Sequence, residues 1–453
     1  MTPSRRPPLL WDVLGEHLQE AAFLWKQRQR SVLAPDYVLS EIAEGDEARL
    51  LAHIEGLVIG GRPAAERLLL PALEGEKPSN IASAAYALLE SSEPDWLTQV
   101  LDWFVQGAEE VREGISQALV LSARADVGAS LIKLFPTVDS SDQRYALRVL
   151  CARQADTGQV LSVRSSGSEE PEWLVAVLRA ARFAPQAIAD VWIRLGLESP
   201  EPQARDAAIE SGLIHGSRMA WSLCRQLMEA GEPGARPALL AFALGGEAPE
   251  IEALIAAVGD PARRDEALWA LGFSGRLSAA EAALATLREN GDWLAAESFA
   301  LITGLPLASF LDEEADEEED EGWDDDDEEE SEEEEKEAPD EAVLEGLPGP
   351  EMQPGKIRVE AVDVWWRQAR ARFEPGGRYL LGHPMQPGSL SSVLEAVPMR
   401  RRAVFGWDLA IRSRGACRLE PLAWAQVQRK QMGAVGQLRP DSLTRSFSRL
   451  LTA

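Results

Sequence analysis

Residues 263–290 read RRDEALWALGFSGRLSAAEAALATLREN, and this stretch contains one complete structural repeat. Its small and aliphatic residues recur at helical spacing in two groups: Ala267, Leu268, Ala270 and Leu271, then Ala280, Ala283, Leu284 and Leu287. We expect Gly275 to break the pattern between the two helices and Ser278 to cap the second one. Because the turn is short, the stretch predicts a pair of antiparallel helices.

The same unit recurs along most of the chain. Its anchor leucine returns every 27 to 32 residues, with an alanine in the fifth place: Leu57, Leu88, Leu119, Leu150, Ala181, Leu213, Leu244, Leu271 and Leu301. Repetition at this spacing is typical of a solenoid, in which each unit buries its apolar face against its neighbours. Ankyrin and TPR signatures do not occur, which leaves the short HEAT-like repeat. The sequence therefore predicts an all-α solenoid of about nine HEAT-like units over residues 46–311, preceded by capping helices in residues 1–45.

Charge divides the rest of the chain into two blocks. Between residues 312 and 341 there are 23 acidic residues and one basic residue, within a chain whose net charge is -30. Such a block repels itself and has nothing to bury, so we expect residues 312–345 to be a disordered acidic linker. Residues 346–453 contain 17 basic and 8 acidic residues. We expect them to form a separate, basic and mostly helical C-terminal module.

Motifs for catalysis or cofactor binding are not found in the sequence. The cysteines form no C-x-x-C pair, and no P-loop, G-x-S-x-G or G-x-G-x-x-G motif is present. The histidines are not followed by glutamate, as they are in HEAT-like iron enzymes: His17, His53, His215 and His383. We expect His17 and His53 to be helix residues bonded to a carboxylate or carbonyl. The sequence therefore predicts no catalytic, cofactor-binding or metal-binding residues.

Composition also restricts the location and partners of the protein. No run approaches the roughly 18 apolar residues that crossing a bilayer requires, and the N-terminus does not resemble a signal peptide. We expect a cytoplasmic protein without a membrane partner. A net charge of -30 would repel nucleic acid. Tryptophan is abundant, with 14 residues, and we expect Trp11 and Trp25 to belong to the capping core at the start of the solenoid.

The basic C-terminal module supplies the candidate binding residues. Helical spacing predicts helices near residues 362–369, 403–411 and 422–432, with an anchored loop over residues 374–388. We take five of its residues as candidates for protein binding: Arg378, Tyr379, Arg400, Arg401 and Arg402. The acidic block is close enough along the chain to contact this module at low salt, and a plain solubilising spacer is the alternative.

Several segments resemble one uncharacterised bacterial family of HEAT-like-repeat proteins. They are HLQEAAFLWKQR at residues 17–28, EARLLAHIEGL at residues 47–57, and GRYLLG at residues 377–382 together with Arg401 and Arg402. Members of this family are often encoded near type VI secretion spike and effector genes. The resemblance implies a role in loading, folding or neutralising secreted effectors, with an effector or spike component as the partner. It supplies no catalytic residues, and the acidic block departs from the family pattern.

These observations predict a non-enzymatic protein-binding scaffold or adaptor. The first alternative is a HEAT-like enzyme resembling bilin lyases or DNA glycosylases. The second is a nucleic-acid-binding module centred on residues 400–402.

Overall fold

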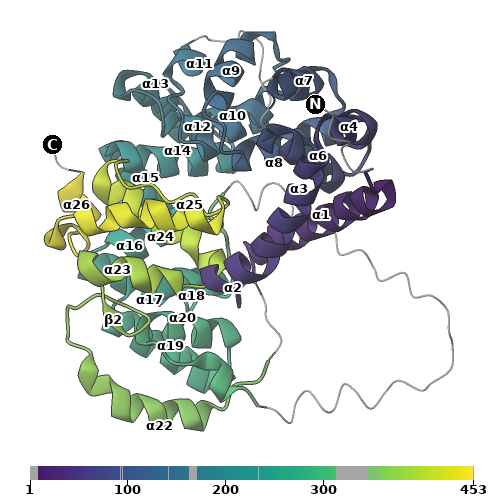
Figure 1. The fold of residues 1–453 in the computed structure, drawn as a ribbon. Coiled ribbons are helices and arrows are strands. Elements are labelled where there is room, and N and C mark those ends of the chain that lie inside the picture. The colour runs from purple at the N-terminus through teal and green to yellow at the C-terminus, as the bar shows by residue number, and fades with distance from the viewer. Residues whose placement is uncertain are drawn as a thin grey trace, which may run out of the picture. The chain divides into compact units, whose positions relative to one another are not determined.

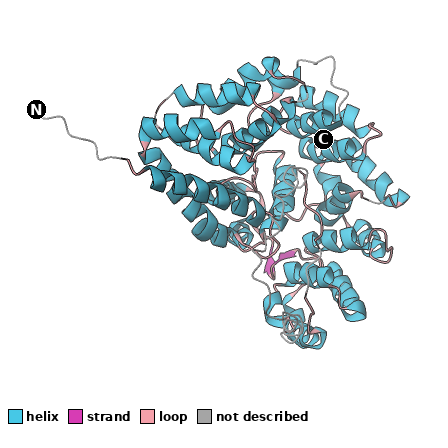
Figure 2. Cartoon of the chain, turned by 90° about the vertical axis from the view of Figure 1, so that its right-hand side faces the viewer, coloured by secondary structure: helices cyan, strands magenta, loops and turns pink. Residues whose placement is uncertain are grey.

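The computed structural model describes residues 9–451, except residues 92, 94, 141, 163–170, 233, 313–345 and 352–354 (Figure 1). Helices packed in consecutive pairs form almost all of its regular structure. Within the described ranges, one short antiparallel hairpin is the only sheet (Figure 2). The predicted all-α repeat fold is confirmed.

The chain forms two compact units. Unit 1 comprises residues 1–196 and 420–429, and unit 2 comprises residues 197–419 and 430–453. Residues 346–453 are therefore divided between the two units, which differs from the separate C-terminal module that the charge pattern predicts.

Unit 1 begins with a helical cap and continues with four helix pairs. The cap contains α1 (Trp11–Ser31), α2 (Leu39–Ile42), the π-helical turn η1 (Ala43–Glu47), α3 (Ala48–Ile59), α4 (Gly61–Ala64), η2 (Ala65–Leu69) and α5 (Leu70–Ala72). The pairs are α6 (Pro78–Glu90) with α7 (Asp95–Gln106), α8 (Glu109–Leu121) with α9 (Val127–Leu134), α10 (Gln143–Ala152) with α11 (Gly158–Ser162), and α12 (Pro171–Ala181) with α13 (Gln186–Leu197). The short turn η3 (Phe135–Thr137) follows α9.

Unit 2 continues the pairing and adds the C-terminal elements. Its repeats contain α14 (Pro202–His215), α15 (Arg218–Ala230), α16 (Arg236–Gly245), α17 (Ala248–Ala257), α18 (Arg264–Ser274), α19 (Leu277–Asn290), α20 (Trp293–Thr303) and η4 (Leu307–Phe310). The later elements are α22 (Val359–Ala369), η7 (Arg370–Arg372), β1 (Tyr379–Leu380), β2 (His383–Pro384), α23 (Pro387–Glu395), α24 (Met399–Ser413), η8 (Gly433–Gln437), η9 (Pro440–Ser442) and α26 (Phe447–Leu450). Helix α25 (Ala425–Met432) begins in unit 1 and ends in unit 2.

The first helices of the repeats pack against one another in succession within each unit. In unit 1, α6, α8, α10 and α12 pack in succession, and in unit 2, α14, α16, α18 and α20 do the same. Alanines beside the anchor leucine are fully buried, as at Ala87, Ala118 and Ala270. A small side chain at this position lets neighbouring helices approach closely, which explains why leucine and alanine recur together in each repeat.

The turn after α18 agrees with the sequence pattern in one respect and differs in another. Gly275 ends the helix in the left-handed region with φ 65°, as the predicted break requires. A Cβ atom there would lie 2.5 Å from the Tyr379 carbonyl oxygen, so the position also needs glycine for space. The prediction for Ser278 is wrong, because α19 already begins at Leu277 after Arg276.

Arginines of the C-terminal segment bind the ends of the first helices in unit 2. Arg412 Nη2 donates to the Leu244 carbonyl at 2.6 Å, in the last turn of α16. Arg378 donates to the carbonyls of Phe273 and Ser274 at the end of α18, at 3.2 and 3.1 Å. The last carbonyls of a helix have no partner within it and carry partial negative charge. This arrangement explains why the segment is rich in arginine.

The turn between β1 and β2 continues the same pattern with main-chain groups. The amides of Leu381 and Gly382 donate to Leu301 and Ile302, in the last turn of α20, at 2.6 and 3.0 Å. The loop that the sequence predicts over residues 374–388 is therefore ordered by the helix end that it covers.

A short antiparallel bridge joins the two sides of the acidic block. Leu311 pairs with Ile357, and the amides of Asp312 and Arg358 donate to Lys356 and Phe310, both at 2.9 Å. The predicted linker, residues 312–345, lies outside the described residues from position 313 onward. Among the helices that are described, none is long and apolar enough to cross a membrane.

Candidate functional site

One tryptophan of the C-terminal segment is enclosed within unit 1. Trp424 is buried, and its indole N–H donates to the Leu121 carbonyl at 3.0 Å. Its ring lies 5.5 Å from that of Tyr86 and 6.5 Å from that of Trp25, in edge-to-face arrangements. Leu121 is the last residue of α8, so the indole satisfies a carbonyl at a helix end.

A buried ion pair holds the main chain on both sides of Trp424. Arg28 and Glu47 are 2.9 Å apart, with side chains 5% and 6% exposed. Arg28 Nη2 donates to the carbonyls of Leu422 and Ala423 at 3.0 and 3.1 Å. Glu47 Oε2 accepts from the amide N–H of Ala425 at 2.9 Å. We call this arrangement of Trp25, Arg28, Glu47, Tyr86 and Leu121 the Trp424 site.

Helix α1 places two of these residues by its spacing. Trp25 and Arg28 are three positions apart and therefore share one face of the helix. Trp25 Nε1 donates to Gln117 Oε1 at 2.9 Å, which fixes the indole beneath Trp424. The Arg28 guanidinium lies 4.6 Å from the centre of the Trp424 ring, a cation–π contact.

The π-helical turn η1 places the acidic partner. A π turn adds one residue to a helix and changes which side chains face its neighbour. Both Asp46 and Glu47 are buried, although they are adjacent in sequence. Asp46 accepts from the Ser31 hydroxyl at 2.5 Å, and Glu47 binds Arg28. The turn thus directs two consecutive carboxylates toward α1.

Two further polar groups shape the segment around Trp424. Gln428 Nε2 donates to the carbonyls of Pro421 and Ala423 at 2.8 and 2.9 Å, which closes the turn before α25. Burial raises the pKa of Glu420 to about 7, and the positive charge of Arg182 opposes this shift. Burial also raises the pKa of Tyr86, whose phenol stays neutral at physiological pH.

Chemically, the Trp424 site recognises polypeptide main chain together with one aromatic side chain. Two carbonyls and one amide N–H of the bound segment are satisfied by charged groups, and such hydrogen bonds are stronger than neutral ones. None of these three bonds depends on the side chains of residues 422, 423 or 425. The site therefore holds a turn and the start of the following helix, with tryptophan at a defined position.

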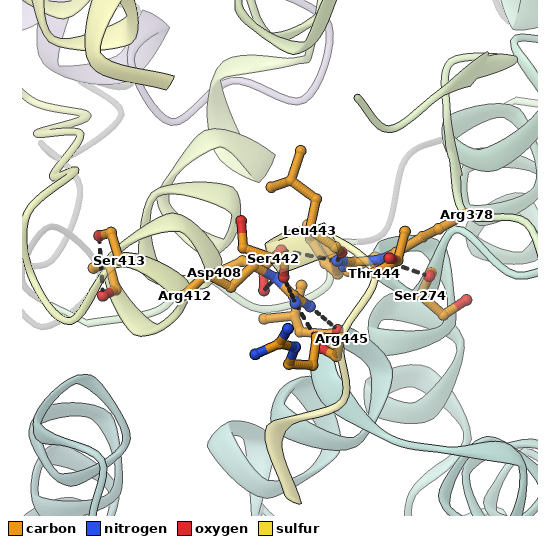
Figure 3. Close-up of polar contacts among 12 residues, drawn as sticks. Ser274, Arg378, Asp408, Arg412, Ser413, Ser442, Leu443, Thr444 and Arg445 are labelled. Atoms are coloured by element: carbon orange, nitrogen blue, oxygen red, sulfur yellow. Dashed lines mark hydrogen bonds and ion pairs between the residues drawn. The ribbon is translucent and has the colours of Figure 1, made fainter. Parts of the chain in front are cut away.

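The predicted binding residues lie elsewhere, in unit 2, and most of them are buried. Figure 3 shows one of them, Arg378, with Asp408 and Arg412. Arg378 Nη1 pairs with Asp408 at 3.0 Å and also donates to the Leu443 carbonyl at 3.0 Å. Arg412 pairs with the second oxygen of Asp408 at 2.7 Å. The three charged side chains are at most 2% exposed. Burial lowers the pKa of Arg412 to about 10, and the attraction of Asp408 opposes this.

Tyr379 packs beside this triad rather than on the surface. Its hydroxyl accepts from the Glu374 amide at 2.8 Å, and its ring is 4.8 Å from that of Phe373. Its own amide donates to Gly275 at 2.8 Å. Tyr379 thus anchors the loop to the end of α18.

The run of residues 400–402 lies at the start of α24 and is also largely enclosed. Arg401 pairs with Glu297 at 3.2 Å and stacks 4.1 Å from the Trp269 ring centre. Arg402 is fully buried and donates to the Leu394 carbonyl. Arg400, the most accessible of the three, donates to the Gly349 carbonyl at 2.8 Å and pairs with Glu351.

These positions correct the predicted binding surface. Arg378, Tyr379, Arg401 and Arg402 are between 0% and 6% exposed. Side chains so enclosed contribute to the interior of unit 2 and present little surface to a separate protein. A basic run in sequence does not distinguish a solvated face from arginines that cap buried helix ends.

The structure brings His17 and His53 together, which their spacing does not reveal. Their Nδ1 atoms are 3.0 Å apart, and the half-exposed rings meet edge to face. The expected carboxylate or carbonyl partner is thus replaced by a second histidine. The His17 ring fits against Gly56, where a Cβ atom would lie 2.8 Å from Nε2. Across the described residues, no group of three or more metal-ligating side chains occurs.

A small pocket near the cap of unit 1 differs from the Trp424 site in chemistry. Its volume is about 80 Å³, and its mostly apolar lining includes Leu57, Leu69, Leu88 and Trp96. Pockets that bind small organic molecules usually have volumes of about 300 Å³ or more. The Trp424 site remains the better candidate for function.

Sequence reasoning missed the Trp424 site, although parts of it were visible. Two of the family-like segments, residues 17–28 and 47–57, end and begin with Arg28 and Glu47. Trp424 was assigned to a predicted helix and given no role. The abundance of tryptophan was the available signal, but it could not show which tryptophan the ion pair surrounds.

Comparisons with known proteins concern the fold. No protein-family model matches the chain, and no curated protein matches it. An engineered protein of solved structure is 16% identical, with 62% of this chain and 87% of that chain covered and a TM-score of 0.29. Human deoxyhypusine hydroxylase in complex with glycerol is 17% identical, with 63% of this chain and 95% of that chain covered and a TM-score of 0.18.

Proposed function

We propose that this chain is a non-enzymatic scaffold or adaptor that binds protein partners along the first helices of its repeats. One observation carries the proposal: unit 1 holds the main chain of residues 422–425 through the buried pair Arg28 and Glu47. Groups that satisfy main-chain carbonyls and amides of a bound segment are what a polypeptide-binding surface requires. Stacked repeats also provide long surfaces of the kind that solenoid proteins use for binding.

The resemblance described above suggests a more specific partner. Members of that bacterial family are often encoded near type VI secretion genes. We therefore propose a secreted effector or spike component as the bound protein. Holding an effector during its loading, folding or neutralisation requires binding without chemistry, in agreement with the scaffold role. A cytoplasmic location follows from this proposal, because effectors are loaded there.

Site-directed photo-crosslinking in the native cell tests the function. A photoreactive residue would replace Glu109 or Glu172, which are exposed on the first helices α8 and α12. Matched positions on second helices are Asp102 of α7 and Asp190 of α13, also exposed. We expect one partner protein to be captured from Glu109 and Glu172, and not from Asp102 or Asp190.

Identification of the captured protein by mass spectrometry then separates the outcomes. An effector or spike component would support the specific form of the proposal. Equal capture from first and second helices, or no capture from any position, would contradict a scaffold that binds along the first helices.

A further inference from the structure

We propose that the Trp424 site is a binding site for a tryptophan-bearing segment of a partner protein, and that residues 421–425 occupy it in the free chain. This inference rests on the proposed scaffold function and specifies the chemistry of the partner segment. The following steps derive that chemistry from the contacts of the bound residues.

The contacts define what a partner segment must contain. The aromatic position needs an indole, because its N–H reaches the Leu121 carbonyl at 3.0 Å while its ring meets Trp25 and Tyr86. The two preceding residues contribute only carbonyl oxygens to Arg28. The following residue must have an amide N–H for Glu47, which excludes proline. It must also be small, because Ala425 is 1% exposed.

The residues that occupy the site form a short part of the chain bounded by helix ends. Ten residues, 420–429, belong to unit 1, while those on either side cluster with unit 2. On one side, α24 is capped at its C-terminus by Arg414 in the left-handed region with φ 55°, followed by Gly415 with φ 77°. On the other side, α25 ends at Met432 and is followed by η8. Residues at the ends of elements can absorb the dihedral changes of a segment that moves.

The chain's own segment is not an ideal occupant. Glu420 enters the site region with its carboxyl buried, and ionisation there is opposed by desolvation, as its raised pKa shows. A partner segment with a neutral residue at this position would avoid that cost. The covalent tether favours the chain's own segment, since linked segments have effective concentrations near millimolar. A partner therefore competes through better contacts or through a tether of its own.

Peptide binding to the full chain tests the inference. The probe is a fluorescein-labelled peptide of residues 418–430, RLEPLAWAQVQRK, followed by fluorescence anisotropy. In the variant Trp424→Ala the chain's own indole is removed, so we expect saturable binding at least tenfold tighter than to the wild-type chain. The same peptide with alanine in place of tryptophan should not bind. Adding Arg28→Ala to Trp424→Ala should abolish binding.

A second variant keeps the test decisive if Trp424→Ala fails to fold. Ala425→Pro removes the N–H that Glu47 accepts, but Ala425 is the first residue of α25, where proline is well tolerated. This variant should also bind the peptide more tightly than the wild-type chain. Trp365→Ala is the matched control, because Trp365 lies in α22 of unit 2. It should leave peptide binding at the wild-type level.

Three results would overturn the inference. The inference is wrong if the Trp424→Ala and Ala425→Pro chains fold but bind the peptide no more tightly than the wild-type chain does. It is also wrong if the peptide that has alanine in place of tryptophan binds as tightly as the peptide with tryptophan. A wild-type dimer in light scattering that Trp424→Ala abolishes would identify a second copy as the occupant instead of a partner protein. Each of these results leaves the crosslinking test of the scaffold function unaffected.

Discussion

The Arg28 guanidinium and the Glu47 carboxylate form one ion pair that also binds main chain on both of its outer sides. Arg28 Nη2 lies 2.9 Å from Glu47 Oε1 and also donates to the carbonyls of residues 422 and 423, while Glu47 Oε2 accepts from the amide of residue 425. A buried ion pair is costly to desolvate unless its remaining hydrogen-bonding capacity is used. Here the main chain of the bound segment uses that capacity. Binding of the segment and stability of the cap of unit 1 are therefore coupled through two side chains.

Removing one partner of this pair should destabilise the protein strongly. In Arg28→Ala, Glu47 is left as an unpaired buried carboxylate and two carbonyls lose their donor, so we expect a loss of about 3–5 kcal/mol. Chemical denaturation followed by circular dichroism measures it. The control Arg370→Ala removes an exposed ion pair with Glu281 and should cost at most about 1 kcal/mol. Similar losses in both variants would contradict a structural role for the buried pair.

Asp408 should be similarly important in unit 2, because one carboxylate serves two arginines. Asp408→Asn keeps the size of the side chain but leaves Arg378 and Arg412 without a countercharge in a dry environment. We expect a destabilisation of about 3 kcal/mol or more, measured by the unfolding midpoint. Asp441→Asn, which removes the exposed partner of Arg445, is the matched control. If Asp408→Asn and Asp441→Asn have the same unfolding midpoint, the buried ion pairs of Asp408 contribute little to the stability of the protein.

The contact between His17 and His53 predicts a loss of stability when one of the two rings is removed. A single hydrogen can lie between the two Nδ1 atoms, so one ring donates and the other accepts. The two rings also meet edge to face.

His53→Ala should be less stable than the wild type by about 1 kcal/mol, because the hydrogen bond and the ring contact with His17 are lost. Thermal unfolding of both chains gives the comparison. Equal unfolding midpoints would show that the contact between the two rings contributes little to stability.

The raised pKa of Glu420 predicts a dependence of stability on pH. Its folded-state pKa of about 7 lies above the usual value of 4.5, so the native state holds the proton more tightly than the unfolded chain. Its contribution to stability is complete below about pH 4 and is lost as the pH rises to 7. Glu420→Gln should match the wild type in acid and exceed it above neutrality, by up to about 3 kcal/mol.

Burial also raises the pKa of Asp206 to about 7. Asp206 is present in both the wild type and Glu420→Gln, so its effect on stability cancels when the two chains are compared. Unfolding by urea at pH 4, 6 and 8 provides the measurement. An advantage for Glu420→Gln that is already present at pH 4 would indicate a packing effect instead of ionisation.

The sequence was sufficient to predict the repeats, because burial imposes a regular spacing of leucine and alanine on every unit. Gly275 was recognisable for the same reason, since a left-handed helix end favours glycine. The predicted C-terminal helices correspond to α22, α24 and α25. The hairpin of β1 and β2 was missed because strands of two residues are too short to show alternation.

The burial of the arginines could not be predicted from sequence. Arginine is rarely enclosed, and the carbonyls that enclose Arg378 and Arg412 belong to helix ends more than 100 residues away in the chain. The Trp424 site has the same origin, because Arg28 and Trp424 are brought together by the folding of unit 1. Charge and spacing identify which residues are exceptional, but they do not identify the distant groups that those residues contact.

The bridge between Leu311 and Ile357 makes the acidic block an exchangeable cassette. Both of its flanks are held in register by main-chain bonds at 2.9 Å. Once the ends of a loop are fixed, each doubling of its length costs only about 0.6 kcal/mol. Evolution could therefore lengthen or recompose this insertion with little effect on the repeats. The same property makes it a permissive place to graft a fluorescent or affinity domain into the chain.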